Sequence, residues 1–186
     1  LPELRRNYPA RLLDVTLDPQ FATNRRIYLS YSEAMAGANG TAVARGVLNA
    51  TDTGLDSVEV IFRQLPKKTS TSAHYGSRLI FRPDGTLLVT LGERSSYSAE
   101  AQSLSSQLGK VVRINADGTV PASNPFFAMG GNAAAVWSYG HRNPLGLYRH
   151  PETGFRRPFY FFRNFKDRAV NYILLTLKPV SGNPPS

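Results

Sequence analysis

A histidine and a glutamate flank a predicted β-hairpin, where they could act together as a general base. His74 lies just before a predicted strand at residues 79–82, and Glu93 follows the returning strand at residues 86–91. The Pro-Asp-Gly sequence at residues 83–85 supplies the turn, because proline presets φ and glycine accepts a positive φ. An antiparallel hairpin brings its open ends together, so we expect the imidazole and the carboxylate to meet on one edge. A histidine oriented by a carboxylate is prepared to accept a proton.

The composition is typical of one folded domain. The chain has 186 residues, of which 41% are hydrophobic and 19% are charged. It contains no cysteine, which excludes disulfides, thiolate metal sites and cysteine nucleophiles. No run of residues is long and apolar enough to form a membrane-spanning helix. The sequence begins with Leu1 and shows no signal peptide, so we expect a processed form or a fragment.

The net charge of +9 does not by itself indicate a nucleic-acid partner. Residues 155–186 hold six Lys/Arg and one Asp, whereas residues 1–154 hold 16 basic and 12 acidic residues. The main body is therefore only mildly basic, and its basic residues form short doublets rather than a continuous stripe. We interpret them as scattered surface charge and expect no nucleic-acid binding.

Short runs with strand-like alternation, separated by turn residues, occupy most of the chain. Besides the hairpin, the expected strands are residues 12–17, 26–31, 41–48, 58–65, 108–115, 134–139 and 145–150. Residues 98–107 form the one plausible helix, and residues 21–24 are expected to be a loop. This pattern predicts an all-β fold.

Three strands that end in proline recur along the chain at nearly constant spacing. Their prolines are Pro19, Pro83 and Pro151, separated by 64 and 68 residues. A period of this size, holding about four short strands, is typical of a β-propeller blade with long loops. The sequence therefore predicts an incomplete β-propeller of two to three blades, each an antiparallel four-stranded sheet. This number is too small for a closed ring, which uses about four to eight blades.

Five stretches together resemble the soluble quinoprotein sugar dehydrogenases, also called the glucose/sorbosone dehydrogenase family. They are residues 12–21, 24–31, 76–93, 108–115 and 137–144, the last reading Trp-Ser-Tyr-Gly-His-Arg-Asn-Pro. The stretches follow the family's order and spacing, and the likeness is greatest to bacterial aldose sugar dehydrogenases. The resemblance implies a six-bladed β-propeller that binds pyrroloquinoline quinone (PQQ) and calcium. It also implies oxidation of aldose sugars at the anomeric carbon, by base-assisted hydride transfer to the quinone.

The resemblance assigns roles to four residues of this sequence. His74 matches the catalytic base, and Glu93 matches the carboxylate that orients it, which is the pair that the hairpin predicts. Arg142 and Asn143 match the polar contacts to the carbonyl region of PQQ. A fixed guanidinium suits that position because negative charge grows on the quinone oxygen during hydride transfer.

Three further residues are candidates for the site or for a structural role. Tyr75 could line the sugar pocket or serve in packing. We interpret His141 and Trp137 as structural residues. Without the resemblance, His74 would be an ordinary loop histidine and Arg142 a surface cation.

The sequence also departs from the family's pattern. The family's glutamine before the first strand, which helps to hold PQQ, is absent from residues 8–11. The region that supplies the calcium ligands is absent too, so we predict no metal ligands in this chain. We divide the chain into a partial propeller at residues 1–154 and a divergent aromatic and basic tail at residues 155–186. The tail could include a native strand of a further blade, but we favour an unrelated segment. The abrupt change predicts a truncated or frame-shifted gene.

These observations leave three functions open. The first is a PQQ-dependent dehydrogenase with an aldose substrate and an external electron acceptor. The second is a non-catalytic carbohydrate-binding module of the same fold, and the third is an inactive remnant. The resemblance further implies a periplasmic or secreted location.

Overall fold

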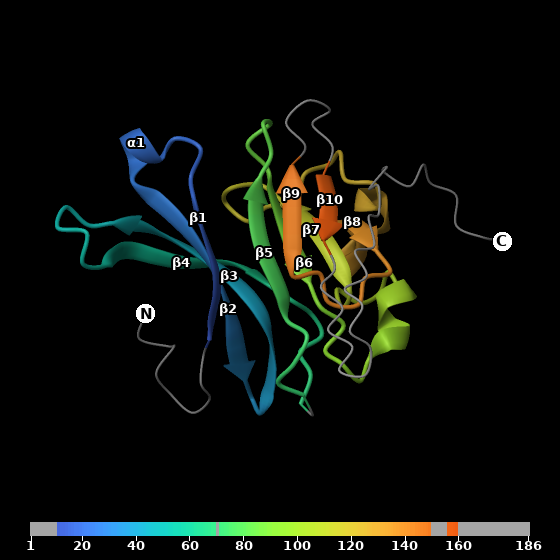
Figure 1. Cartoon of the computed structure of the whole chain (residues 1–186). Coiled ribbons are helices and arrows are strands. Elements are labelled where there is room, and N and C mark those ends of the chain that lie inside the picture. Colours follow the sequence, from blue (N-terminus) through green and yellow to red (C-terminus); the bar gives the residue numbers. More distant parts are fainter. Residues whose placement is uncertain (1–10, 70, 150–155, 160–186) are drawn as a thin grey trace.

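The computed structural model describes residues 11–69, 71–149 and 156–159, which form three antiparallel sheets (Figure 1). The first sheet has the order β1-β2-β3-β4, and the second has the order β5-β6-β7-β8. The first contains β1 (Leu12–Leu17), β2 (Arg26–Met35), β3 (Ala38–Leu48) and β4 (Leu55–Arg63). The second contains β5 (Gly76–Phe81), β6 (Leu87–Leu91), β7 (Lys110–Ile114) and β8 (Val136–Tyr139). In the third, β9 (Gly146–Arg149) pairs with β10 (Arg156–Phe159). The sheets confirm the predicted all-β class.

The short helical segments differ from the sequence prediction. Residues 21–24, expected to be a loop, form one α-helical turn, α1 (Phe21–Asn24). The helix expected at residues 98–107 is the shorter 3₁₀ segment η2 (Ser98–Gln102). It ends early because the Ala101 carbonyl oxygen already accepts from Gly140 N and from Lys110 Nζ. Two further 3₁₀ segments, η3 (Phe127–Met129) and η4 (Gly131–Ala133), lie in the connection before β8.

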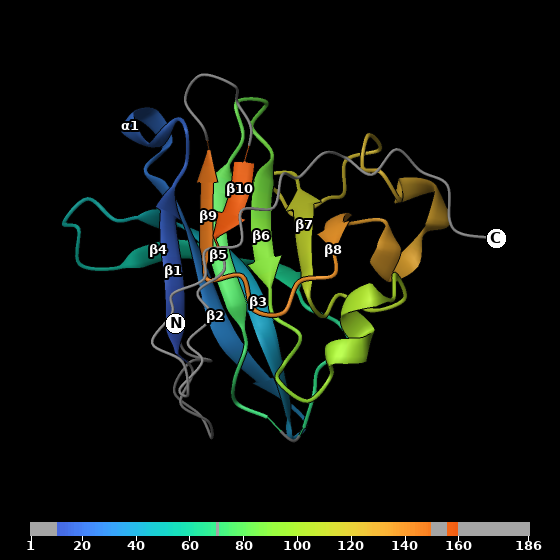
Figure 2. The ribbon, with the colours of Figure 1, turned by 45° about the vertical axis from the view of Figure 1, so that its right-hand side comes forward.

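The first strands of the three sheets lie side by side. β1 lies against β5, and β5 lies against β9, as Figure 2 also shows. Each sheet therefore begins at the same line through the molecule and extends outward from it. This arrangement is the one predicted for consecutive propeller blades.

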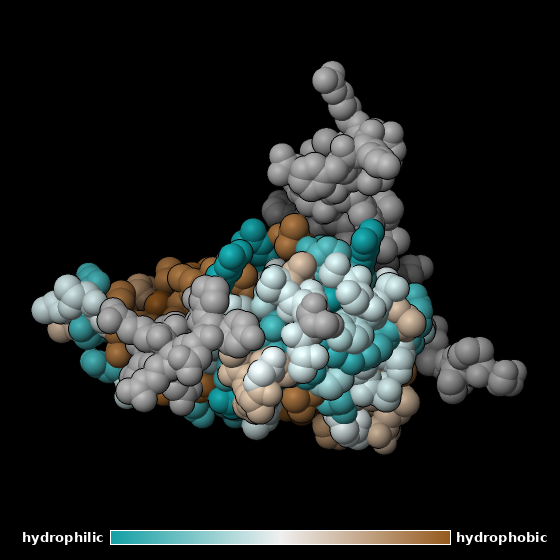
Figure 3. All heavy atoms as spheres, turned by 90° about the horizontal axis from the view of Figure 1, so that it is seen from below, coloured by the Kyte–Doolittle hydropathy of each residue, from teal (hydrophilic) through white to brown (hydrophobic). Residues whose placement is uncertain are grey.

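The main core lies between the first and second sheets. Tyr28, Val43 and Phe62 of the first sheet pack against Leu79, Leu87, Leu91 and other buried apolar residues of the second. The opposite face of the first sheet is apolar as well, with Tyr31, Ala42, Ala44 and Val60 forming a separate cluster. Hydrophobic atoms accordingly gather over this part of the molecule in Figure 3. A sheet with two apolar faces matches a blade that packs on both sides.

Polar side chains of the first sheet also hold β5. Asp14 accepts the backbone N–H of Leu79 at 2.9 Å. Ser30 Oγ donates to the Ser77 carbonyl oxygen at 2.6 Å. These bonds use backbone groups of β5 where its pairing with β6 is irregular. Side chains of β1 and β2 therefore fix β5 at Ser77 and Leu79.

A buried lysine supports the loop that contains η2, and a buried histidine lies near that lysine. Lys110 Nζ donates to the carbonyl oxygens of Leu108, Glu100 and Ala101 at 2.6, 2.9 and 2.9 Å. Burial lowers the pKa of Lys110 to about 8, against the opposing effect of Glu100. Burial and the Lys110 charge lower the pKa of His141 to about 4. His141 is therefore neutral at pH 7, and its Nε2 hydrogen-bonds Ser138 Oγ at 2.8 Å.

The predicted tail falls largely outside the described residues. Its described part, residues 156–159, forms β10 and continues the third sheet. Nothing described bears on residues 160–186, so the division at residue 154 and the origin of the tail stay predictions. No helix among the described residues has the length and apolar character needed to cross a membrane.

The packing of the core predicts that Leu87→Ala strongly destabilises the fold. Leu87 is fully buried between the sheets, so the substitution should lower the free energy of unfolding by about 2–5 kcal/mol. Leu17→Ala on β1 is the matched control, because that side chain is 53% exposed and should cost less than about 1 kcal/mol. Urea unfolding of the two variants measures the difference, and equal losses would contradict this account of the core.

His141 predicts a specific loss of stability in mild acid. Its pKa is about 4 in the folded chain, against 6.5 for an unperturbed histidine. As the pH falls through this interval, the unfolded chain takes up a proton that the folded chain does not. The free energy of unfolding should therefore fall by roughly 3 kcal/mol between pH 6.5 and 4.

His141→Gln should reduce the dependence of the free energy of unfolding on pH below pH 6.5. Above about pH 7, the stabilities of the two proteins should vary with pH in parallel. Denaturant unfolding across the pH range provides the measurement. Identical slopes below pH 6.5 would show that His141 does not carry this effect.

Candidate functional site

The predicted site residues lie in loops at one end of the sheets. His74 lies near the end of the connection from β4 to β5, and Glu93 lies two residues after β6. Arg142 and Asn143 lie between β8 and β9. These connections share the end of the molecule where the β2–β3 turn lies, at the bottom of Figure 1. The antiparallel pairing of β5 with β6 joins the first two loops, as the hairpin predicted.

Glu93 is the centre of the site. Its carboxylate is fully buried, and Oε1 lies 2.5 Å from His74 Nδ1 and 3.8 Å from Arg142 Nε. The His74 side chain is 25% exposed and the Arg142 side chain 59% exposed. One buried carboxylate thus contacts an accessible imidazole and an accessible guanidinium.

The Glu93 contact selects one form of the histidine. An ionised carboxylate only accepts hydrogen bonds, so the Nδ1 atom of His74 carries the proton that Glu93 binds. In the neutral ring, Nε2 then has a free lone pair. His74 can therefore accept a proton at Nε2, and Glu93 stabilises the cation that results.

Backbone contacts bring the three loops together around Gly92. Glu93 N donates to the Arg142 carbonyl oxygen at 2.8 Å, and Gly76 N donates to Asn143 Oδ1 at 2.9 Å. A Cβ atom at Gly92 would lie 1.9 Å from the His74 carbonyl oxygen and 2.9 Å from Asn143 Oδ1. The convergence therefore requires glycine at this position.

The structure adds residues that the sequence analysis did not single out. Gln64, fully buried at the end of β4, donates from Nε2 to the Gly92 carbonyl oxygen at 3.0 Å. Its Oε1 accepts the backbone N–H of Thr41 at 3.1 Å, which joins β3 to the site. Arg94 is also fully buried and contacts the loop before His74. Its one sequence signal is its place directly after Glu93, where the strand pattern ends.

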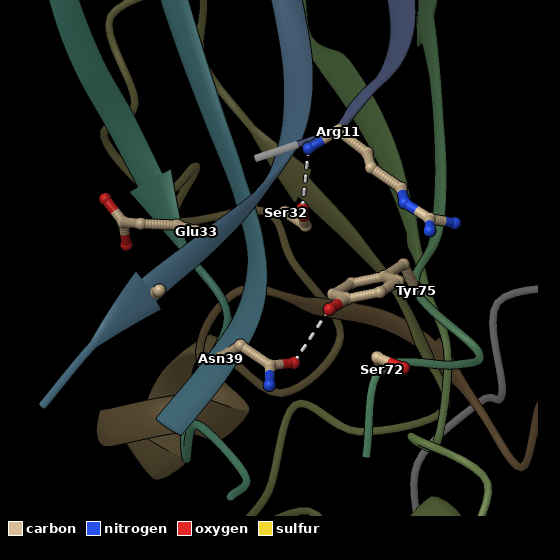
Figure 4. A pocket seen from close by; sticks show the side chains of 7 residues that line it. Arg11, Ser32, Glu33, Asn39, Ser72 and Tyr75 are labelled. Atoms are coloured by element: carbon tan, nitrogen blue, oxygen red, sulfur yellow. Dashed lines mark hydrogen bonds between the residues drawn. The ribbon is translucent and has the colours of Figure 1, made fainter. Parts of the chain in front are cut away.

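Tyr75 is held by a hydrogen bond and also lines a pocket, so its role in sugar binding stays a prediction. Its hydroxyl donates to Asn39 Oδ1 at 2.8 Å, and its ring lines a pocket of about 260 Å³ (Figure 4). The pocket is otherwise lined by Arg11, Ser32, Glu33, Ala34, Asn39 and Ser72. Most of the residues that line it have polar side chains, and it adjoins His74 through Tyr75.

Two other candidates are held by structural contacts. His141 is buried against Ser138, as described above. The ring of Trp137 packs against the guanidinium groups of Arg82 and Arg113, at 4.9 and 4.6 Å from its centroid. Within the described part of the chain, no three His, Asp or Glu side chains are grouped as metal ligands.

The crowding at Gly92 predicts a severe effect of Gly92→Ala. The new methyl group would overlap the His74 carbonyl oxygen, so the loop at residues 71–75 must move. We expect a loss of about 1–3 kcal/mol or more in stability. The chemical shifts of the His74 ring, measured by NMR, should change as well.

Gly40→Ala is the matched control, since its Cβ would meet neighbouring atoms only at 3.4 Å and beyond. It should leave the His74 resonances unchanged. Unaltered His74 resonances in Gly92→Ala would contradict the proposed close approach.

Comparison with known proteins gives the chain a family. The family described as Glucose / Sorbosone dehydrogenase matches residues 1–155. The aldose sugar dehydrogenase YliI of Escherichia coli is 42% identical over 152 residues, which are 81% of this chain and 40% of that protein. An uncharacterized protein of Synechocystis, slr1608, is 44% identical over 151 residues, which are 76% of this chain and 36% of that protein.

Solved structures agree with the fold. The apo-form of the soluble aldose sugar dehydrogenase from E. coli superimposes with a TM-score of 0.75 and 42% identity, covering 81% of this chain and 43% of that one. The PQQ-bound aldose sugar dehydrogenase from Streptomyces coelicolor gives a TM-score of 0.76 at 25% identity, covering 96% of this chain and 48% of that one. The chain thus spans less than half the length of these relatives. With a family match over most of its residues and a corresponding fold, the chain belongs to the glucose/sorbosone dehydrogenase family.

Proposed function

We propose that this chain carries the catalytic-base side of a PQQ-dependent aldose dehydrogenase. The observation that supports this most directly is the His74–Glu93–Arg142 arrangement, in which a buried carboxylate orients an accessible imidazole beside an accessible guanidinium. Membership of the family supports the substrate class, an aldose sugar. Because the chain spans less than half of its relatives, the activity of the whole protein is part of the proposal.

His74 is the proposed proton acceptor. With Nδ1 donating to Glu93, its Nε2 takes the proton of the anomeric hydroxyl group. The sugar loses its anomeric hydrogen as hydride in the same oxidation and becomes the lactone. Glu93 holds the ring in the required tautomer and stabilises its charged form.

Arg142 and Asn143 are the proposed contacts to the cofactor. Arg142 is largely exposed next to the base, and its planar array of donors suits the carbonyl and carboxylate oxygens of PQQ. Asn143 uses its amide oxygen for Gly76 N, which leaves its NH₂ group to donate to a ligand. These donors fit PQQ, which when bound supplies the acceptor for two electrons. Arg142 then stabilises negative charge that develops on an oxygen beside it.

We assign calcium no role in the proposed reaction of these residues. Oxygen ligands bind calcium in groups of six to eight, largely from carboxylates and carbonyls. The described residues do not group three acidic or histidine side chains in one place. We therefore assign no calcium ligand to the described segments of this chain.

The family resemblance supports two further parts of the proposal. Work in the periplasm or outside the cell is one, and transfer of the electrons to an external acceptor is the other. The truncated or frame-shifted origin of residues 155–186 also stays a proposal, and DNA sequence across codon 154 tests it.

An activity assay tests the proposed reaction. The purified chain would be given PQQ, calcium, glucose and an artificial electron-accepting dye. We expect dye reduction that His74→Gln lowers by about 10²- to 10⁴-fold, because the base is lost. Arg142→Gln should weaken PQQ binding by roughly tenfold, since it removes charge-assisted hydrogen bonds.

Arg25→Gln is the control for both variants. Arg25 pairs with Asp52 beside α1, at the opposite end of the first sheet, so its loss should alter neither activity nor PQQ binding. Sugar binding without dye reduction would favour the carbohydrate-binding module. Absence of any PQQ binding would favour the inactive remnant.

A further inference from the structure

Arg94 is a fully buried arginine whose hydrogen bonds converge on the segment before His74. It donates to the carbonyl oxygen of Ala73 at 2.5 Å and to that of Thr71 at 2.8 Å. A third bond reaches the side-chain oxygen of Asn39. Because Ala73 directly precedes His74, these bonds fix the backbone that carries the imidazole.

The residue after His74 is held by the same guanidinium. The Cζ atom of Arg94 lies 3.6 Å from the centroid of the Tyr75 ring, within the range of a cation–π contact. The Tyr75 hydroxyl donates to Asn39 Oδ1, the oxygen that also binds Arg94 (Figure 4 shows the tyrosine bond). Arg94 therefore contacts the chain on both sides of His74, and Asn39 ties this group to β3 of the first sheet.

The backbone of His74 needs such support. Its φ is +52°, in the left-handed region that costs a residue other than glycine about 1–2 kcal/mol. Arg94 itself has a φ of +64°, and its N–H points to the His74 carbonyl oxygen at 3.4 Å. Residues in such conformations persist only where surrounding contacts hold them.

Several contacts offset the burial of the Arg94 charge, although its Nε has no hydrogen-bond partner among the described residues. Burial lowers the pKa of the guanidinium, whereas the neighbouring Tyr75 and Glu93 act in the opposite direction. A buried cation is unfavourable unless its N–H groups are bonded and opposite charge lies near. Lysine carries the same charge but lacks the planar set of donors that reaches several acceptors at once.

We propose that Arg94 is a positioning residue that holds residues 71–75 so that the His74 imidazole stays against Glu93. Its consequence for catalysis rests on the proposed function, whereas the effect on the His74–Glu93 contact does not. The test therefore reads that contact directly and needs no cofactor or sugar.

NMR of the chain labelled with ¹⁵N-histidine provides the measurement. The sequence has three histidines, so the His74 signals can be assigned by comparison with His74→Gln. In the unmodified chain, the Nδ1 proton bonded to Glu93 should resonate far downfield and exchange slowly with water. Arg94→Lys should speed this exchange by about tenfold or more, because the segment that holds the ring loses charge-assisted bonds.

Arg113→Lys is the matched control. Arg113 is also buried, bonds Asn124 and stacks on Trp137, away from residues 71–75. It should leave the His74 proton unchanged even where it lowers stability. If Arg94→Lys does not fold, Asn39→Ala removes the shared acceptor and should produce a smaller change in the same direction.

An unchanged His74 proton in folded Arg94→Lys would overturn the proposal, as would an equal change in Arg113→Lys. Where the chain oxidises sugar, Arg94→Lys should lower kcat by up to about 10²-fold with little change in KM. Altered His74 exchange in a chain without activity would support the positioning role and contradict the dehydrogenase.

Discussion

The site depends on the close approach of three chain segments over Gly92. The His74 carbonyl oxygen and the Asn143 amide oxygen occupy the space that a Cβ atom would fill. This lets Glu93 bond the backbone of Arg142 on one side and the ring of His74 on the other. The side chains of His74 and Arg142, which belong to two different connections, can then share the Glu93 carboxylate. They can do so because the backbones of both connections are fixed close to Gly92 and Glu93.

The burial of Glu93 restricts the protonation form and the position of the His74 ring. A fully buried carboxylate is unfavourable unless donors and positive charge lie near it. His74 binds Oε1 of Glu93, whereas Oε2 has no hydrogen-bond partner among the described residues. Arg94 and Arg142 lie close by. The same environment favours one histidine tautomer and limits the movement of the ring. The accessible groups around this carboxylate are the imidazole of His74 and the guanidinium of Arg142. At this end of the molecule, Glu93 and Arg94 are therefore buried, whereas His74 and Arg142 are partly exposed.

The packing of the sheets supplies the rigid frame. The first sheet has apolar residues on both faces, one packed against the second sheet and the other carrying the partly exposed Leu12, Val15 and Leu17. Paired residues such as Leu29, Ala44 and Val60 share that second face. Two apolar faces are expected for a propeller blade, and the relatives' structures have the corresponding fold. The candidate site residues of this chain lie on loops at one end of these sheets, and such loops can vary without disturbing the sheets that carry them.

The sequence alone determined much of this picture. Strand alternation and turn residues predicted β1 and the β5–β6 hairpin closely, because both follow local rules of period and turn chemistry. The hairpin also predicted that His74 and Glu93 meet, since pairing of neighbouring strands fixes where their ends lie. The family motifs added Arg142 and Asn143, whose roles stay predictions.

The tertiary structure decided the rest. The one-turn helix α1 and the short η2 segment depend on contacts that no local pattern encodes, such as Lys110 Nζ on the carbonyl oxygen of Ala101. The supporting residues Asn39, Gln64 and Arg94 lie far apart in sequence or in separate sheets, and each looks like an ordinary polar residue of a loop or strand end. Their roles follow from burial and from the acceptors around them, which exist only once the two sheets pack together.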